Sequence, residues 1–201
     1  MSLFMNSAEA RTDSDLLEAY KSGNIKAFEA LYDRHADSVL TYLVSMLRDR
    51  GRAEDILQEV FVGLIRNLNT LPSDVHLRSY LMAGGRNRVY NQWRDMGRNQ
   101  SAMKKYAVFE KIRRVPESLA SAEKNMEAEE LCRQLNSAMD KLGHEEREVV
   151  LLHAHSQLTF ECVAEVTETP VGTVATRYRR AMEKLKTELN RNGQKSGARN
   201  Q

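Results

Sequence analysis

A basic segment near the C-terminus carries side chains suited to contacting a polyanion. Those at helical spacings of three and four residues are Thr173, Thr176, Arg177 and Arg180. A helix would place them on one strip. Arginine hydrogen-bonds guanine in the major groove, and any cation neutralises phosphate. We therefore expect this strip to read duplex DNA, with Arg177 as its main base reader, and Lys184, one turn further along, to contact phosphate.

Two helices joined by a tight turn are needed to hold that strip, and residues 158–189 predict them. Thr159 can cap a short first helix. Thr169 and Pro170 supply a cap and a first helical residue for a longer second helix, in which Val174 begins an apolar face. The layout is typical of a helix-turn-helix, whose second helix enters the major groove. The alternative is an ordinary amphipathic helix pair with solvated charges.

A second group of polar and charged side chains is interleaved with aromatic rings in the predicted helix at residues 77–94. It comprises Arg78, Arg86, Asn87, Arg88 and Arg94 together with Tyr80, Tyr90 and Trp93. Bases stack on rings while phosphates pair with cations, so this mixture suits single-stranded DNA. Core packing is the competing explanation for most of the rings, and Trp93 is the ring that we most expect to be exposed.

An acidic strip is predicted on the helix before that one, at about residues 52–69. Asp55 and Glu59 are four residues apart, with Gln58 beside them. Apolar residues, among them Ile56, Leu64 and Ile65, are expected on the opposite, inner face of the same helix. The acidic strip must therefore face outward, either as a simple solvated surface or as a protein-binding face.

The composition excludes several classes of protein. Only three prolines and ten glycines interrupt the chain, which favours an all-helical fold. No apolar run reaches membrane-spanning length, and the two cysteines, Cys132 and Cys162, fit a reducing cytosol. His153 and His155 with Cys162 lack metal-ligand spacing. We expect a cytoplasmic protein that is not an enzyme and needs no metal or cofactor.

Charge alternates along the chain although the net charge is only +2. Residues 78–114 and 171–201 are strongly basic, whereas residues 1–77 and 115–170 are acidic. Two separated basic blocks predict two separate contacts with a polyanion.

Helical periodicity and breaks predict an all-α protein with two small helical domains joined by a linker, the second ending in the helix-turn-helix. The first domain, residues 1–95, would hold four helices, the first opened by a capping box of Asp15 and Glu18. Residues 96–120 have weak periodicity and form the linker. The second domain covers residues 121–189, and residues 190–201 form a polar, disordered tail.

Four segments in this order resemble the sigma factors of bacterial RNA polymerase, specifically the extracytoplasmic-function (ECF) group. AFEALYDRHADSVLTYL is similar to the start of the family's first domain, AEDILQEVF to its polymerase-binding helix and LRSYLMAGGRNRVYNQWRD to its promoter-opening helix. PVGTVATRYRRAMEKL resembles its terminal recognition helix. The resemblance covers almost the whole chain from Asp15 to Leu189.

The resemblance implies a role for each surface. Asp55, Gln58 and Glu59 would bind the clamp of core RNA polymerase. The loop from Leu71 to Leu77 would take a flipped base of the −10 element. The side chains that would help to hold the melted strand are Arg78, Asn87, Arg88 and Trp93. Thr173, Thr176, Arg177 and Arg180 would read the −35 element as promoter duplex, and an anti-sigma factor is a further expected partner.

Four residues depart from the family's pattern, and the loop TLPSDVH lacks the family's aromatic and Arg-Gly pattern. Ala175 stands where a basic residue is frequent, Thr167 stands where the turn usually has glycine, and Gly84–Gly85 replace bulkier residues. The glycine pair indicates either a close helix contact or local looseness. Two other readings of the chain are a DNA-binding regulator that acts without the polymerase and an adaptor built only of protein-binding helices. Neither an evident ligand pocket nor a coiled-coil seam supports the first, and the second leaves the basic blocks unexplained.

Overall fold

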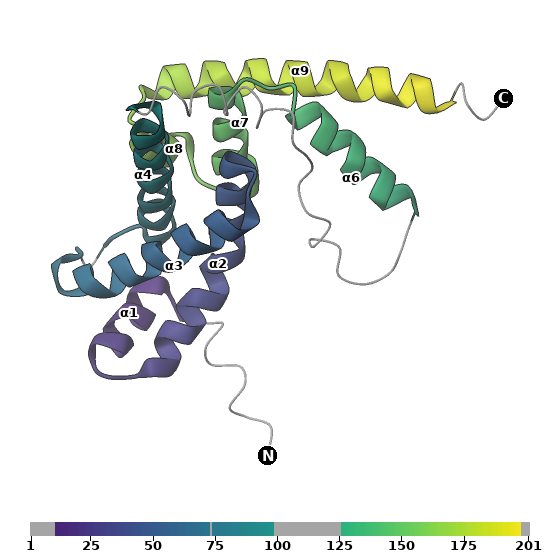
Figure 1. Ribbon diagram of the computed structural model, residues 1–201. Coiled ribbons are helices and arrows are strands. Elements are labelled where there is room, and N and C mark those ends of the chain that lie inside the picture. Colours follow the sequence, from purple (N-terminus) through teal and green to yellow (C-terminus); the bar gives the residue numbers. More distant parts are fainter. Residues whose placement is uncertain (1–10, 73, 99–125, 198–201) are drawn as a thin grey trace. The chain divides into compact units, whose positions relative to one another are not determined.

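Helices make up every regular element in the part of the chain that the computed structural model describes, residues 11–72, 74–98 and 126–197 (Figure 1). The chain divides into two compact units, residues 1–104 and 105–201. The predicted all-α class with two helical domains is confirmed. Among the described helices, none has the length and apolar character that a membrane crossing requires.

The described residues of the first unit form four α-helices, in which α2 packs against each of the other three (Figure 1). Their bounds are α1 Asp13–Lys21, α2 Ile25–Leu47, α3 Arg50–Asn67 and α4 Leu77–Arg98. A single 3-10 turn, Leu68–Thr70, follows α3. The fourth helix therefore runs past residue 95, the predicted end of this domain. Most of the predicted linker lies outside the described residues, which resume at residue 126.

The apolar stripes that the sequence predicts form the core of this unit, with two exceptions. Ile56 and Leu64 of α3 are buried, but Ile65 is 40% exposed. Ile65 lies about 100° around the helix from Leu64, at the edge of the buried face, so the neighbouring helices cover it only in part. Tyr32 of α2, which is at helical spacing from buried Val39 on the apolar stripe of that helix, is 37% exposed, although its ring contacts Phe61 at a centroid distance of 4.7 Å.

The helix starts differ from those that the sequence predicts. Thr12 caps α1 by accepting the Asp15 N–H at 3.2 Å, and the Asp15 carboxylate accepts the Thr12 N–H at 2.9 Å. This reciprocal pair replaces the predicted box of Asp15 and Glu18. Arg48, which has a left-handed φ of 56°, ends α2, and Asp49 caps α3. Gly51 lies inside α3, and the break between α2 and α3 falls at Arg48 and Asp49.

A half-buried polar cluster joins α1 to α2. The Asp13 carboxylate accepts a hydrogen bond from Arg34 at 2.7 Å and lies 2.9 Å from Nε2 of His35, which is almost completely buried. Burial of the Asp13 carboxyl raises its pKa, but hydrogen bonds and charges from His35 and Arg34 outweigh this effect. The pKa of Asp13 is therefore below its ordinary value of 3.8.

Two glycines bring α4 close to its neighbours. A Cβ atom on Gly85 would lie 3.1 Å from the side chain of Leu43 on α2, and one on Gly84 would lie 3.8 Å from Val60 on α3. The glycine pair therefore marks a close helix contact, which was the first of the two sequence interpretations.

The second unit is built around one long helix. Its elements are α6 Met126–Met139, α7 His144–Val150 with a π-helical continuation Leu151–His155, α8 Phe160–Thr167 and α9 Val171–Gly197. The core cluster joins Ala138, Leu142 and Val150 to Ala181 and Leu185 of α9. Helix α9 continues to Gly197, into the tail that we expected to be disordered from residue 190. Helix propagation adds one hydrogen bond per residue, which supports such an extension.

Replacing Asp13 by asparagine should lower the free energy of unfolding of the first unit at neutral pH by about 1–3 kcal/mol, because His35 and Arg34 lose their charged acceptor. A carboxyl whose pKa is lowered in the folded state stabilises above its unfolded pKa and loses that contribution as pH falls through the folded pKa. The parent should thus lose stability below about pH 4 more steeply than Asp13→Asn. Denaturation followed by Trp93, the single tryptophan of the chain, measures this unit.

Asp33→Asn, at an exposed position of α2, is the matched control and should leave the pH profile unchanged. Parallel acid profiles for the parent and Asp13→Asn would contradict the role of the cluster.

Candidate nucleic-acid interfaces

The predicted helix-turn-helix is formed by α8 and α9. Thr159 caps α8 as expected, accepting the Cys162 N–H at 3.2 Å. The residue of the turn with a left-handed backbone is Glu168, with φ 52°. The position where the family usually has glycine is therefore Glu168 and not Thr167, which is the last residue of α8. The Pro170 carbonyl accepts the Val174 N–H at 3.1 Å. Pro170 therefore caps α9, one residue later than predicted.

Three aromatic side chains fix α8 against α9. His153 stacks on Phe160 with ring centroids 4.2 Å apart, and Tyr178 of α9 meets both rings edge-on. Nδ1 of His153 lies 2.7 Å from the Leu158 carbonyl, an arrangement in which the ring donates. Spacing along the sequence argues against His153 as a metal ligand, but it does not reveal this packing role, because the rings that His153 contacts are on other helices.

Burial of one face of α9 turns the predicted reading strip toward solvent. Val174 and Ala181 are fully buried, whereas Thr173 and Arg180 are exposed. Thr176 is half-buried, and its hydroxyl donates to the Gly172 carbonyl at 2.8 Å. The structure thus brings the predicted strip together on one side of the helix.

Two cations of this surface are paired with the first turn of α7. Arg177 forms an ion pair with Glu145 at 2.7 Å, and Lys184 donates to both carboxylate oxygens of Glu146 at 2.7 Å. The hydrogen bond from Lys184 is the main reason why the pKa of Glu146 lies below its ordinary value. Helical periodicity predicts neither pair, because the partners are on different helices.

A ladder of one cation and two rings lies along α4. The Arg86 guanidinium sits 4.2 Å from the centre of the Tyr90 ring, and Tyr90 packs against Trp93 at 5.1 Å. Trp93 is half-buried, so it is less exposed than the sequence led us to expect. Asn87 is exposed on the same helix and Arg78 is half-buried.

Arg88 occupies a different position from that ladder. Its guanidinium reaches α3, where it donates to the Glu59 carbonyl at 3.0 Å and to the Glu59 carboxylate at 3.2 Å. It also donates to the carbonyl of Gly84 at 3.0 Å. Gly63 leaves the space for this group, since a Cβ atom there would lie 2.9 Å from it. A side chain predicted to hold DNA therefore links two helices of its own unit.

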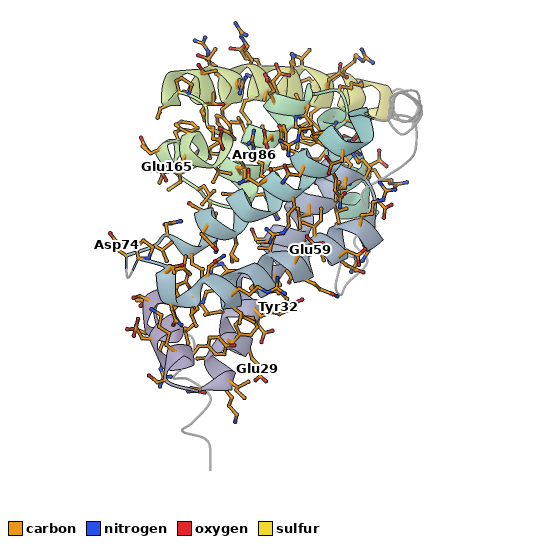
Figure 2. The ribbon with its side chains drawn as sticks, turned by 60° about the vertical axis from the view of Figure 1, so that its left-hand side comes forward. Glu29, Tyr32, Glu59, Asp74, Arg86 and Glu165 are labelled. Atoms are coloured by element: carbon orange, nitrogen blue, oxygen red, sulfur yellow. The ribbon has the colours of Figure 1, made fainter. Side chains whose placement is uncertain are left out.

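The acidic strip on α3 is exposed as expected, with Asp55, Gln58 and Glu59 all on the surface. The side chain of Glu59 is labelled in Figure 2. The same face continues with Val62, which is 43% exposed, and Ile65. The apolar part of this face was not predicted, because the sequence pattern assigned Ile65 to the core and left Val62 without a role.

The loop before α4 is only partly described, because residue 73 lies outside the described residues. Asp74 is exposed, as Figure 2 shows for its labelled side chain. Nδ1 of His76 accepts the Ser79 N–H at 3.3 Å, so His76 helps to start α4.

Comparison with known proteins assigns both units. The first matches the family described as sigma-70 region 2 over residues 31–99, and the second matches sigma-70 region 4 over residues 132–185. The chain is 30% identical to the RNA polymerase sigma factor CarQ of Myxococcus xanthus, over 85% of this chain and 93% of CarQ. It is 29% identical to the ECF sigma-E factor of Escherichia coli K12, over 89% of this chain and 94% of that protein.

Solved structures have the same fold. CnrH, in its complex with the cytosolic domain of CnrY, superposes with a TM-score of 0.62 at 25% identity, covering 89% of this chain and 97% of CnrH. RpoE of Bartonella quintana, in complex with NepR, has a TM-score of 0.64 at 19% identity, covering 83% of this chain and 98% of RpoE.

Arg88→Lys should destabilise the first unit by about 1–3 kcal/mol although it keeps the charge, because lysine cannot make the forked contacts to two carbonyls. Denaturation followed by Trp93 fluorescence measures the loss. Arg94→Lys, at an exposed position of the same helix, is the control and should change stability by less than about 0.5 kcal/mol. If the parent and Arg88→Lys are equally stable, the contacts of Arg88 between α3 and α4 do not stabilise the unit, and Arg88 is again a candidate for contacting DNA.

Proposed function

Since this chain belongs to the sigma-70 family of RNA polymerase sigma factors, in the ECF group, and directs promoter-specific transcription initiation, we propose how its two units divide that work. The first unit binds core polymerase through α3 and the melted −10 strand through α4. The second unit reads the −35 duplex with α9. The observation that carries the proposal is that Thr173, Thr176, Arg177 and Arg180 share one side of α9 beside its buried face, with Thr173 and Arg180 exposed and the other two half-buried.

The polymerase surface combines charge with exposed apolar side chains. Asp55, Gln58 and Glu59 continue into Val62 and Ile65 at helical spacing along α3. Interfaces have an apolar centre and a polar rim, and a strip of this composition supports such a contact better than a purely solvated one. Glu59 is already paired with Arg88, so Asp55 and Gln58 are the polar groups most available to a partner.

The melted strand is assigned to the ladder of Arg86, Tyr90 and Trp93. Unstacked bases bind to aromatic faces and phosphates to cations, and this ladder offers both within two turns of α4. Asn87, exposed beside it, adds a hydrogen-bonding group.

The proposed role needs no chemistry from the chain itself, because the polymerase synthesises the RNA. We accordingly propose a non-enzymatic factor that acts in the cytoplasm, where polymerase and promoter are found. RpoE of Bartonella quintana was solved in complex with the anti-sigma factor NepR. We propose that this chain likewise has an anti-sigma partner, and Leu131 and Leu135, both exposed and one turn apart on α6, are suited to apolar contact with it.

Asp55→Arg combined with Val62→Glu should reduce co-purification with core polymerase at least tenfold, since it reverses a charge and places a carboxylate in the apolar part of the interface. Pull-down by tagged core enzyme measures this, with circular dichroism as the check on folding. Asp37→Arg, at an exposed position of α2, should bind like the parent. Undiminished binding by the folded double variant would exclude this face of α3.

Trp93→Ala should impair strand opening more than initial promoter binding, because stacking on a base contributes about 1–3 kcal/mol. Permanganate reactivity of thymines in the −10 region should fall, while Trp93→Phe, which keeps a ring, should retain most of it. Unchanged thymine reactivity in a folded Trp93→Ala variant would assign Trp93 to packing against Tyr90 alone.

A further inference from the structure

Two side chains hold the guanidinium of Arg177, the Glu145 carboxylate and the Thr169 hydroxyl. Nη2 lies 2.7 Å from Glu145, and Nη1 donates to the Thr169 hydroxyl at 3.4 Å. The Arg177 side chain is only 24% exposed, whereas that of Glu145 is 63% exposed. A guanidinium has five N–H donors, so three remain for a further acceptor while both contacts persist.

The neighbouring Lys184–Glu146 pair is built differently. The Glu146 side chain is mostly buried, and its carboxylate also accepts the Gly143 N–H at 3.2 Å at the start of α7. Glu146 is therefore part of the local structure of α7. Among the described residues, the capping acceptor for the Gly143 N–H is Glu146 and not Glu145. Glu145 is exposed, and its contact is the ion pair with Arg177.

A carboxylate beside an arginine has opposite effects on two kinds of DNA contact. It cancels the charge that would attract a phosphate, and this attraction supplies most of the binding to arbitrary sequence. It leaves the remaining N–H donors of the planar guanidinium able to meet the two acceptors of a guanine edge. It also restricts the arginine to few rotamers before binding, so less side-chain entropy is lost when the DNA binds.

We propose that Glu145 is a specificity-determining residue of the duplex-binding surface, which positions Arg177 for a guanine edge and suppresses its contribution to non-specific binding. The proposal rests on the duplex-reading role of α9 given above. It assigns to Glu145 no DNA contact of its own, so it acts as a positioning residue through Arg177.

Glu145→Gln in the full chain is the test, with two DNA probes measured at several salt concentrations. One is a pool of short random-sequence duplexes, and the other is the best duplex that the parent selects from that pool. The variant should bind the random pool about fivefold more tightly, with a salt slope steeper by about one unit, because one more cation meets phosphate. Affinity for the selected duplex should not rise, so the specificity ratio should fall about fivefold or more.

Glu130→Gln is the matched control, since it removes one charge and one ion pair, with Arg133, from α6 of the same unit. It should leave the ratio within about twofold of the parent value. In an Arg177→Ala background, Glu145→Gln should no longer change the ratio. Equal gains on both probes, no change on either, or the same loss of ratio with Glu130→Gln would each overturn the proposal. If the parent selects no sequence at all, the duplex-reading role fails instead.

Discussion

The burial of one apolar stripe on α9 fixes the rotation of that helix, and the surface offered to DNA depends on this rotation. Val174, Ala181 and Leu185 lie against the neighbouring helices and are almost fully buried. A helix cannot turn without exposing such a stripe, so Thr173 and Arg180 are held toward solvent. The aromatic contacts of His153, Phe160 and Tyr178 add a second constraint, because they fix α8 relative to α9.

Partner residues within each unit limit what the cations can do. Arg88 is fixed by carbonyl and carboxylate groups of α3 and α4, and Arg177 is paired with Glu145. A cation with such a partner contributes less to the long-range attraction of a polyanion than its formal charge suggests. The two basic blocks of the sequence therefore overstate the charge that is available to DNA. Recognition depends more on where the remaining N–H donors of these paired arginines point.

Helical periodicity was enough to predict the class, the order of the helices and the helix-turn-helix, because it depends only on residues within one helix. The outward position of Asp55, Gln58 and Thr173 follows from the same periodicity. It was not enough for Arg88 or Arg177, whose partners are 29 and 32 positions away in the sequence. Helix starts were misplaced by one to three residues where Thr12, Asp49 and Pro170 compete with nearby residues of similar capping ability.

The central claim is that the two units contact different promoter elements, and site-specific cross-linking tests it most directly. A photo-reactive phenylalanine analogue replaces Thr173 of α9 in one chain and Asn87 of α4 in another, both exposed positions. Each chain is assembled with core polymerase on a promoter and irradiated. The account predicts that position 173 labels duplex near −35 and position 87 labels the non-template strand near −10. Labelling of the same element from both positions, or no labelling from position 173, would contradict it.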